Sequence, residues 1–191
     1  MTTQLREAEA EAEVEAGVEI KAALREHDSL AAENAFKHGM RRLVGGVAAI
    51  AVVDDNGVRL GAAASAVCSL SATPPTLIVC LNLQGSVGRV LRPGRAFSVN
   101  VLGERHVELA RVFGGMTNTP SSARFAHGAW NDGAQGAPVL SDALVTFECV
   151  VARESVAYAT HMIAIGNVVA VTLGESGAAL SYREGAFLSV G

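Results

Sequence analysis

The sequence lacks the features of a membrane or secreted protein. Its 191 residues contain no run of about 18 apolar residues, which is the length a helix needs to cross a membrane. The N-terminus is acidic and has neither the basic nor the apolar region of a signal peptide. We therefore expect a cytoplasmic protein with no membrane partner.

Cysteine is scarce, and its placement argues against a disulfide framework. Cys68, Cys80 and Cys149 are odd in number and lie in apolar segments, which is typical of reduced, buried side chains in a cytosolic protein. No C-x-x-C pair occurs, and the five histidines are scattered without the spacing of metal ligands. No metal site is predicted.

Positive charge is also in short supply. Lys and Arg number 15 against 19 Asp and Glu, a net charge of −4 that argues against a nucleic-acid partner. Residues 1–33 hold nine acidic and three basic residues, so the remainder is slightly basic, and eleven of its twelve basic residues are Arg. Arginine suits an anionic small ligand, although ordinary solubilising arginines fit the composition equally well.

The common catalytic and nucleotide-binding motifs are missing. The sequence has no G-x-G-x-x-G after a strand and no G-x-x-x-x-G-K-[ST], which excludes the Rossmann fingerprint and the P-loop. It has no G-x-S-x-G elbow of a serine hydrolase and no H-E-x-x-H of a zinc protease. A nucleotide ligand would have to bind by another route.

Half of the residues are hydrophobic, enough for one domain with a core. Residues 4–33 are rich in Ala, Glu and Leu and predict an acidic helical extension. A second helix is expected from about Ser29 to Leu43, serving either as a docking arm or as a solvated helix. From Val44 onward the pattern is that of closely spaced strands, which favours an antiparallel barrel or sandwich. The expected strands are 44–53, 58–67, 76–82, 95–102, 143–157, 161–173 and 180–188, with a short helix at 104–113 and a long loop at 114–138.

Two polar segments are candidates for a ligand site. Residues 63–75 carry Ser65, Ser69 and Ser71 at a strand end, where small hydroxyl side chains let a flat ring approach the backbone. Farther on, Ser86 is expected to begin a helix with Arg89 close by, a combination that binds phosphate. Taken alone, both segments also fit ordinary turns and helix caps.

Seven or more blocks, in a preserved order and spacing, resemble the short-chain flavin reductases, the reductase components of two-component flavin monooxygenases such as 4-hydroxyphenylacetate 3-monooxygenase. They include TPPTLIVCLN at 73–82, FSVNVL at 97–102, ARVFGGMT at 110–117, ATHMIAIGNVV at 159–169 and LSY at 180–182. The resemblance covers roughly residues 36–188. It implies a mainly β, split β-barrel with a few short helices, which would span residues 34–191 and follow the helical extension at 1–33.

The same resemblance implies an activity and a set of partners. The protein would be a homodimer that oxidises NADH or NADPH and reduces FMN or FAD, and the reduced flavin would diffuse to a separate monooxygenase. His161 would lie by the nicotinamide as the catalytic residue. The implied flavin-binding residues are Ser65, Ala66, Val67, Cys68, Ser69 and Ser71 along the ring, Asn82, Ser86 and Arg89 at the phosphate, and Phe113, Gly114 and His161 around the site. Tyr182 would lie near the site across the dimer.

The sequence departs from the family pattern at two motifs. The Phe-Ala-Gly motif is Phe113-Gly114-Gly115 here, and the Gly-(Asp/Thr)-His motif is Ala159-Thr160-His161, which puts the local turn in question. Without the resemblance, His161 and Tyr182 would be core and strand residues, Arg111 and Arg124 surface residues and Trp130 a loop anchor. The alternative functions are a non-catalytic flavin-binding split barrel and an oxidase similar to pyridoxamine-phosphate oxidase.

Overall fold

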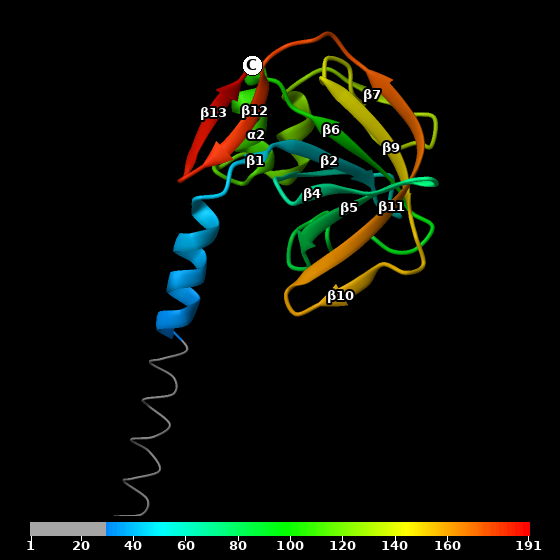
Figure 1. Cartoon of the computed structure of the whole chain (residues 1–191). Coiled ribbons are helices and arrows are strands. Elements are labelled where there is room, and N and C mark those ends of the chain that lie inside the picture. The colour runs from blue at the N-terminus through cyan, green and yellow to red at the C-terminus, as the bar shows by residue number, and fades with distance from the viewer. Residues whose placement is uncertain (1–29) are drawn as a thin grey trace, which may run out of the picture. The chain divides into compact units, whose positions relative to one another are not determined.

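The structure, a computed structural model, describes residues 30–191 (Figure 1). Most of the predicted acidic extension lies outside the described residues. The chain divides into two compact units, of which the second spans Val44–Gly191. In the first, residues 30–41 form a helix, within the range predicted for the second helix. Its apolar side chains Leu30, Phe36 and Met40 are exposed.

The second unit is built on one antiparallel sheet that curls into a half-barrel, so the mainly β fold class predicted from the sequence is confirmed (Figure 1). The strand order is β3-β2-β6-β9-β11-β5-β4, and β10 pairs with the free part of β11. The strands are β2 (Ala48–Val53), β3 (Arg59–Ala64), β4 (Val67–Ala72), β5 (Pro75–Asn82), β6 (Ala96–Val101), β9 (Val145–Val151), β10 (Val156–Tyr158) and β11 (His161–Leu173).

Smaller elements complete the unit around this sheet. A three-stranded sheet has the order β1-β12-β13, and β7 pairs with β8. The bounds of these elements are β1 (Gly45–Gly46), β12 (Ala179–Arg183), β13 (Ala186–Val190), β7 (Trp130–Asp132) and β8 (Pro138–Leu140). The helical elements are η1 (Glu104–His106), α2 (Val107–Phe113) and η2 (Ser121–Ala126).

The continuous apolar runs of the sequence become the buried strands. In β2 the five residues from Ala48 to Val52 are all buried, because one face meets the barrel interior and the other meets α2. Phe97 and Val99 of β6 are fully buried in the barrel core beside them. Full burial of such a side chain contributes about 1.5–3 kcal/mol, so these strands hold the half-barrel together.

A buried amide fixes the long loop to the sheet. Asn100 is fully buried, and its Nδ2 donates to the carbonyl of Ala49 at 3.0 Å. Its Oδ1 accepts from the Leu140 amide at 2.8 Å and from the Thr146 hydroxyl at 3.1 Å. All of these groups are therefore satisfied, and β8 is held against the sheet next to the segment that contributes to the site.

Four predicted strands are interrupted in the structure. The segment 44–53 divides into β1 and β2, which belong to different sheets. The segment 58–67 divides into β3 and β4 because the chain breaks at Ser65 and Ala66, and 143–157 divides into β9 and β10. The segment 180–188 is a hairpin rather than one edge strand, with Glu184 and Gly185 in the left-handed region at φ +50° and +82°.

The cysteine prediction holds in part. All three thiols are free, and burial raises the pKa of the Cys149 thiol to about 12. Cys68, however, is exposed, because it lies on the outward-facing side of β4. Across residues 30–191, no helix is both long and apolar enough to cross a membrane.

Candidate functional site

A cavity of about 580 Å³ opens between the ends of β3 and β5, the C-terminal end of α2 and η2. Residues predicted from the two polar segments, far apart in sequence, meet in its lining. Of the residues predicted for the site, those that line this cavity are Ser65, Ala66, Asn82, Ser86, Arg89, Phe113, Gly114 and His161.

One wall of the cavity is the break between β3 and β4. The Ala66 carbonyl accepts the Cys80 amide at 3.0 Å, which ties this break to β5, while Ser65 and Ala66 remain exposed. The preceding residues Ala62, Ala63 and Ala64 also line the cavity and add only methyl groups. Small side chains leave the backbone open, so a flat ring can lie against this wall as the sequence predicts.

The turn after β5 forms the next wall. Asn82 Oδ1 accepts the Gln84 amide at 2.8 Å, and the Asn82 carbonyl accepts the Gly85 amide at 2.9 Å. A Cβ at Gly88 would lie 2.2 Å from the Asn82 carbonyl oxygen, so this close approach requires glycine. The turn therefore closes tightly and directs its residues toward the cavity.

The prediction that a helix begins at Ser86 is wrong, because residues 84–90 form turns and bends. Two helix-like bonds occur, from the Arg89 amide to Gly85 and from the Leu91 amide to Val87, but no regular helix forms around Gly88. Ser86 and Arg89 nevertheless line the cavity. A hydroxyl and a guanidinium at a tight turn retain the capacity to bind phosphate without a helix N-terminus.

The third wall of the cavity contains His161, which is the first residue of β11. His161 is exposed, and its Nδ1 lies 2.8 Å from the Thr160 hydroxyl. The Thr160 carbonyl accepts the Leu83 amide at 2.9 Å, which joins this hairpin to the turn after β5. Ala159, in the place of the family's glycine, adopts a left-handed φ of +49°. Alanine therefore occupies a backbone conformation here that favours glycine.

An aromatic cluster supports the fourth wall. Phe113 stacks on Trp130 with ring centroids 5.3 Å apart and planes 11° apart, and Phe125 meets both rings edge-on. The Trp130 indole donates to the His127 carbonyl at 2.7 Å. A Cβ at Gly61 would lie 2.2 Å from the Phe113 ring, so the ring packs directly on β3. Trp130 is therefore a loop anchor, as the sequence predicts.

Among the lining residues that sequence reasoning missed are Ser121 and Arg124 of η2. Arg111 is exposed as expected, but Arg124 is half-buried, and its Nη1 donates to the Gly61 carbonyl at 3.2 Å. The sequence signal for Arg124 is weak, because a single arginine in a Gly- and Ser-rich loop is typical of a surface residue.

The charge of the cavity is positive. Its lining contains the guanidinium groups of Arg89 and Arg124 and no carboxylate. Because the walls are otherwise apolar or neutral, these groups make the cavity attractive to a phosphorylated ligand.

Five predicted residues lie elsewhere. Four of them, Val67, Cys68, Ser69 and Ser71, line a groove of about 340 Å³ beside Phe147, because β4 runs away from the cavity after Ala66. Tyr182 lines a smaller cavity of about 170 Å³, which shares Ser65 and Gly114 with the main one. It therefore lies behind the β3 wall.

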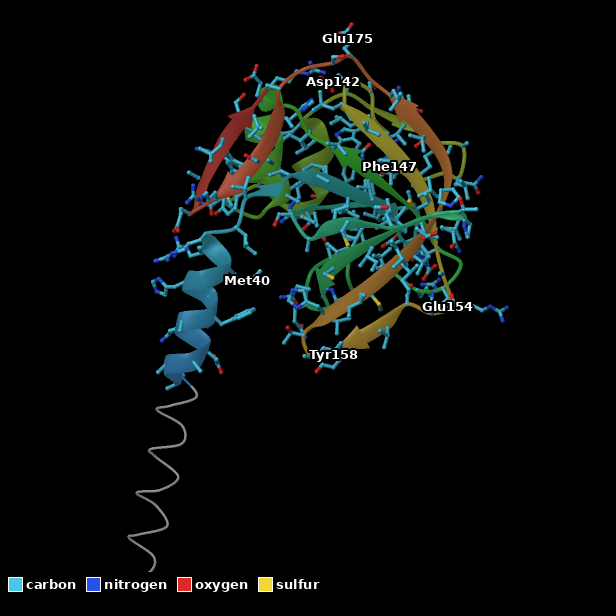
Figure 2. The ribbon with its side chains drawn as sticks, viewed as in Figure 1. Met40, Asp142, Phe147, Glu154, Tyr158 and Glu175 are labelled. Atoms are coloured by element: carbon cyan, nitrogen blue, oxygen red, sulfur yellow. The ribbon has the colours of Figure 1, made fainter. Side chains whose placement is uncertain are left out.

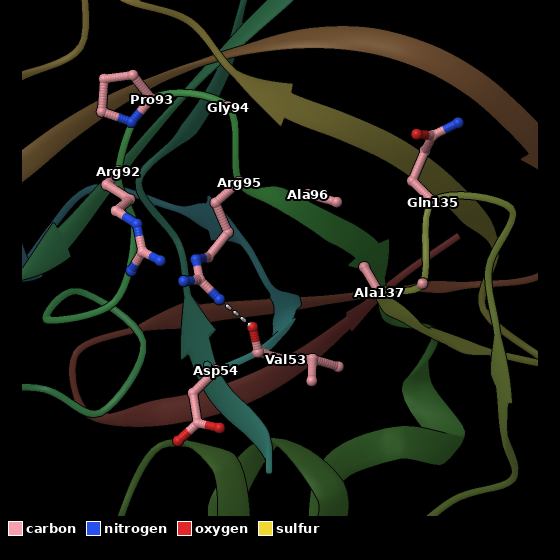
Figure 3. A pocket seen from close by; sticks show the side chains of 10 residues that line it. Val53, Asp54, Arg92, Pro93, Gly94, Arg95, Ala96, Gln135 and Ala137 are labelled. Carbon is pink, nitrogen blue, oxygen red and sulfur yellow. Dashed lines mark hydrogen bonds between the residues drawn. The ribbon is translucent and has the colours of Figure 1, made fainter. Parts of the chain in front are cut away.

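Another cavity, of about 430 Å³, contains two arginines but no free guanidinium (Figure 3). Arg95 Nη1 donates to the Val53 carbonyl at 2.6 Å, and Arg92 and Arg95 each lie 2.5 Å from Asp55. Hydrogen bonds from the two guanidinium groups lower the pKa of Asp55 to about 2. Because both guanidinium groups are already paired with Asp55, we assign these two arginines a structural role.

Comparisons with known proteins agree with this geometry. Residues 40–191 match the family model described as "Flavin reductase like domain". The chain is 42% identical over 147 residues to a protein named FMN reductase (NADH) RutF from Agrobacterium fabrum, covering 77% of this chain and 82% of the relative.

Solved structures give the same picture. A putative flavin reductase from Haemophilus somnus matches with a TM-score of 0.75 and 31% identity, covering 82% of this chain and 98% of that one. BorF, described as the flavin reductase component of a bacterial two-component tryptophan halogenase, matches with a TM-score of 0.72 and 25% identity, covering 83% and 98%.

Proposed function

The chain belongs to the flavin reductase like domain family, and from this premise we propose that the cavity between β3, β5, α2 and η2 is where it transfers hydride from a nicotinamide cofactor to a flavin. The observation that carries the proposal is the convergence of Ser65, Ser86 and His161 in one cavity without a carboxylate. It supports an NAD(P)H-dependent flavin reductase over a protein that only stores flavin, because one wall is left for a second ligand.

The residues fit a flavin on two grounds. The break at Ser65 and Ala66 offers an open backbone edge for the polar side of a flat ring. The turn with Ser86 and Arg89, which only Gly88 allows to close so tightly, offers a hydroxyl and a guanidinium for the phosphate end. Both FMN and FAD carry these two features. Because the named relative is an FMN reductase that uses NADH, we take FMN and NADH as the preferred pair.

The chain's own residues have little proton transfer to perform. A bound flavin supplies a ring nitrogen that accepts hydride directly from the nicotinamide, so the task of the protein is to hold two rings in contact. Backbone groups at Ser65 and Ala66 orient one ring, and the Phe113 wall limits its movement. His161 is the first residue of β11 and lines the cavity. It is placed to donate a hydrogen bond to the nicotinamide amide, or to the charge that develops beside that amide during hydride transfer.

One absorbance experiment tests the function. Purified protein is mixed with NADH, and loss of absorbance at 340 nm is followed before and after FMN is added, then with FAD and with NADPH. We expect flavin-dependent NADH oxidation. If neither nicotinamide cofactor is consumed with either flavin, the chain is a non-catalytic flavin-binding protein and the proposal is wrong.

We also propose that the reduced flavin leaves to serve a separate monooxygenase in the cytoplasm. BorF is named as a component of a two-component system, which supports a diffusible product. A coupled assay tests this step: a flavin-dependent monooxygenase separated from the reductase by a dialysis membrane should still form product. If product forms only when the two proteins mix, the flavin does not travel freely.

A homodimer is the assembly that we propose for this activity. Val156, Ile163 and Cys80 form one row across β10, β11 and β5, on the face opposite the buried Ala164. Val156 is 53% exposed and Tyr158, at the tip of β10, is 73% exposed (Figure 2). An apolar row of this kind supports contact with a second copy.

Sedimentation of the protein tests the dimer. Val156→Arg should shift it toward the monomer, whereas Val58→Arg, at a comparably exposed valine in the β2–β3 hairpin, should leave the mass unchanged. A monomeric wild-type protein at micromolar concentration would contradict the assembly.

A further inference from the structure

Arg124 carries an unneutralised charge in the wall of the cavity. Its Nη1 donates to the Gly61 carbonyl, but its Nε is closed off from solvent and has no hydrogen-bond partner in the described part of the chain. Within residues 30–191, no carboxylate forms an ion pair with its guanidinium. A guanidinium that lines a cavity without a carboxylate partner keeps its charge available to an anionic ligand.

Other arginines of the barrel differ from Arg124 in this respect. Arg59 pairs with Asp132 at 2.7 Å, and the nearly buried Arg95 pairs with Asp55. Arg89 also lines the cavity, but it is exposed and keeps its hydration. Partial burial, the absence of a carboxylate partner within residues 30–191 and a place in the cavity wall therefore coincide at Arg124.

The two arginines of the cavity stand on different walls. Arg89 belongs to the turn after β5, whereas Arg124 contacts Gly61 near the start of β3. A flavin phosphate at Ser86 and Arg89 would use the wall formed by the turn after β5, so Arg124 on the other wall is available to a second anionic group.

We propose that Arg124 binds the diphosphate of the nicotinamide dinucleotide that donates hydride. This inference rests on the proposed function. Because the nicotinamide must stack on the flavin ring, both ligands would share this cavity, and the η2 wall with Arg124 is the wall that the flavin phosphate does not use. The planar fork of a guanidinium binds two phosphate oxygens at once. Arg124 is thus a positioning residue that holds the donor without touching the reacting atoms.

A pair of hydride donors isolates this role. NADH carries the diphosphate, while 1-benzyl-1,4-dihydronicotinamide carries the same reacting ring and no phosphate. For Arg124→Gln, the ratio of kcat/KM for NADH to that for the benzyl compound should fall at least tenfold, mainly through KM for NADH. Arg124→Lys should recover part of the ratio. Arg111→Gln, at an exposed arginine of α2 outside the cavity, should change the ratio less than twofold.

Three outcomes would overturn the inference. An equal loss of kcat/KM with both hydride donors would mean that Arg124 only holds η2 against Gly61. A loss confined to FMN, absent with the phosphate-free acceptor riboflavin, would assign it to the flavin phosphate. A fall in kcat/KM for NADPH alone would mean that Arg124 binds the 2′-phosphate of that cofactor. Thermal melting of each variant separates these results from misfolding, and Arg124→Lys keeps the test open if Arg124→Gln does not fold. Failure of the proposed function is distinct, because the wild-type protein would then oxidise neither donor in the presence of FMN.

Discussion

His161 and Asn82 lie directly opposite each other in the β5–β11 ladder, and both line the cavity. Side chains at opposite positions of an antiparallel pair share one face and lie within reach of each other. The residue expected at the nicotinamide and the residue that shapes the phosphate turn are therefore linked by one rung of the sheet. A shift of either strand moves both ends of the site together.

The first prediction concerns His161. Because it is exposed at the mouth of the cavity and bonded only to the Thr160 hydroxyl in the described residues, its removal should cost little stability. We expect His161→Ala to raise KM for NADH or lower kcat by about tenfold, the usual effect of losing one charge-assisted hydrogen bond, while FMN still binds. Steady-state kinetics and FMN fluorescence titration measure the two effects.

The matched control for this variant is His38→Ala, at an exposed histidine of the helix 30–41. It should leave both measurements at wild-type values. Unchanged steady-state kinetics for His161→Ala would remove this residue from the site.

The second prediction concerns the turn after β5. Ser86→Asp sets a carboxylate where the phosphate of FMN is expected, so Kd for FMN should rise by about tenfold or more through like-charge repulsion. Riboflavin, which has no phosphate, should lose much less affinity. Fluorescence titration with the two flavins gives the comparison, and Ser86→Ala serves as the uncharged control. Equal losses for FMN and riboflavin would contradict a phosphate role.

The third prediction concerns the aromatic support of the cavity. Trp130 is half-buried against Phe113 and Phe125, so Trp130→Ala should lower the free energy of unfolding by about 2–3 kcal/mol, somewhat less than for a fully buried tryptophan. Trp130→Phe keeps the stack and loses only the bond to His127, so its cost should be about 1 kcal/mol. Urea unfolding measures the free energy of unfolding of both variants. Similar losses for Trp130→Ala and Trp130→Phe would show that the aromatic stack contributes little to stability.

Sequence reasoning found the parts of the fold that depend on long apolar runs, because such runs have few alternatives to burial. It placed β2, β5, β6 and α2 within a few residues of their bounds. It missed the break at Ser65 and Ala66, since this depends on the Cys80 amide from another strand. It also missed that residues 84–90 stay irregular, which the contact of Gly88 with Asn82 explains.

The candidate site was predictable where the resemblance supplied motifs. Asn82, Ser86 and His161 share one cavity because β5 and β11 pair, a relation that no local pattern contains. The resemblance also implied the segment from Val67 to Ser71, but in the structure this segment lines a different groove from Ser65. Arg124 was missed because its position depends on how the long loop folds back onto Gly61.

The fourth prediction concerns acid stability. Hydrogen bonds from Arg92 and Arg95 lower the pKa of Asp55 to about 2, below the value of about 3.9 in an unfolded chain. Its contribution to stability is therefore complete above about pH 4 and is lost as the pH falls toward 2. Asp55→Asn should lower Tm at pH 6 and flatten its decline between pH 4 and 2. The control variant Glu175→Gln removes an exposed carboxylate and should follow the wild-type curve of Tm against pH. If the curve of Asp55→Asn runs parallel to that of the wild type, the role of the two guanidinium groups is contradicted.

The fifth prediction concerns the turn that carries His161. Ala159 holds a left-handed φ of +49°, where its Cβ crowds the backbone and glycine does not. Ala159→Gly should therefore raise the free energy of unfolding by about 1 kcal/mol, the gain from relieved strain less the added freedom of the unfolded chain. Ala157→Gly, in the extended strand β10 of the same hairpin, should lower it by roughly 0.5–1 kcal/mol. Urea unfolding of both variants decides the point: opposite signs identify strain at Ala159, whereas two losses would mean that the alanine is relaxed there and that the family's glycine is not needed to orient His161.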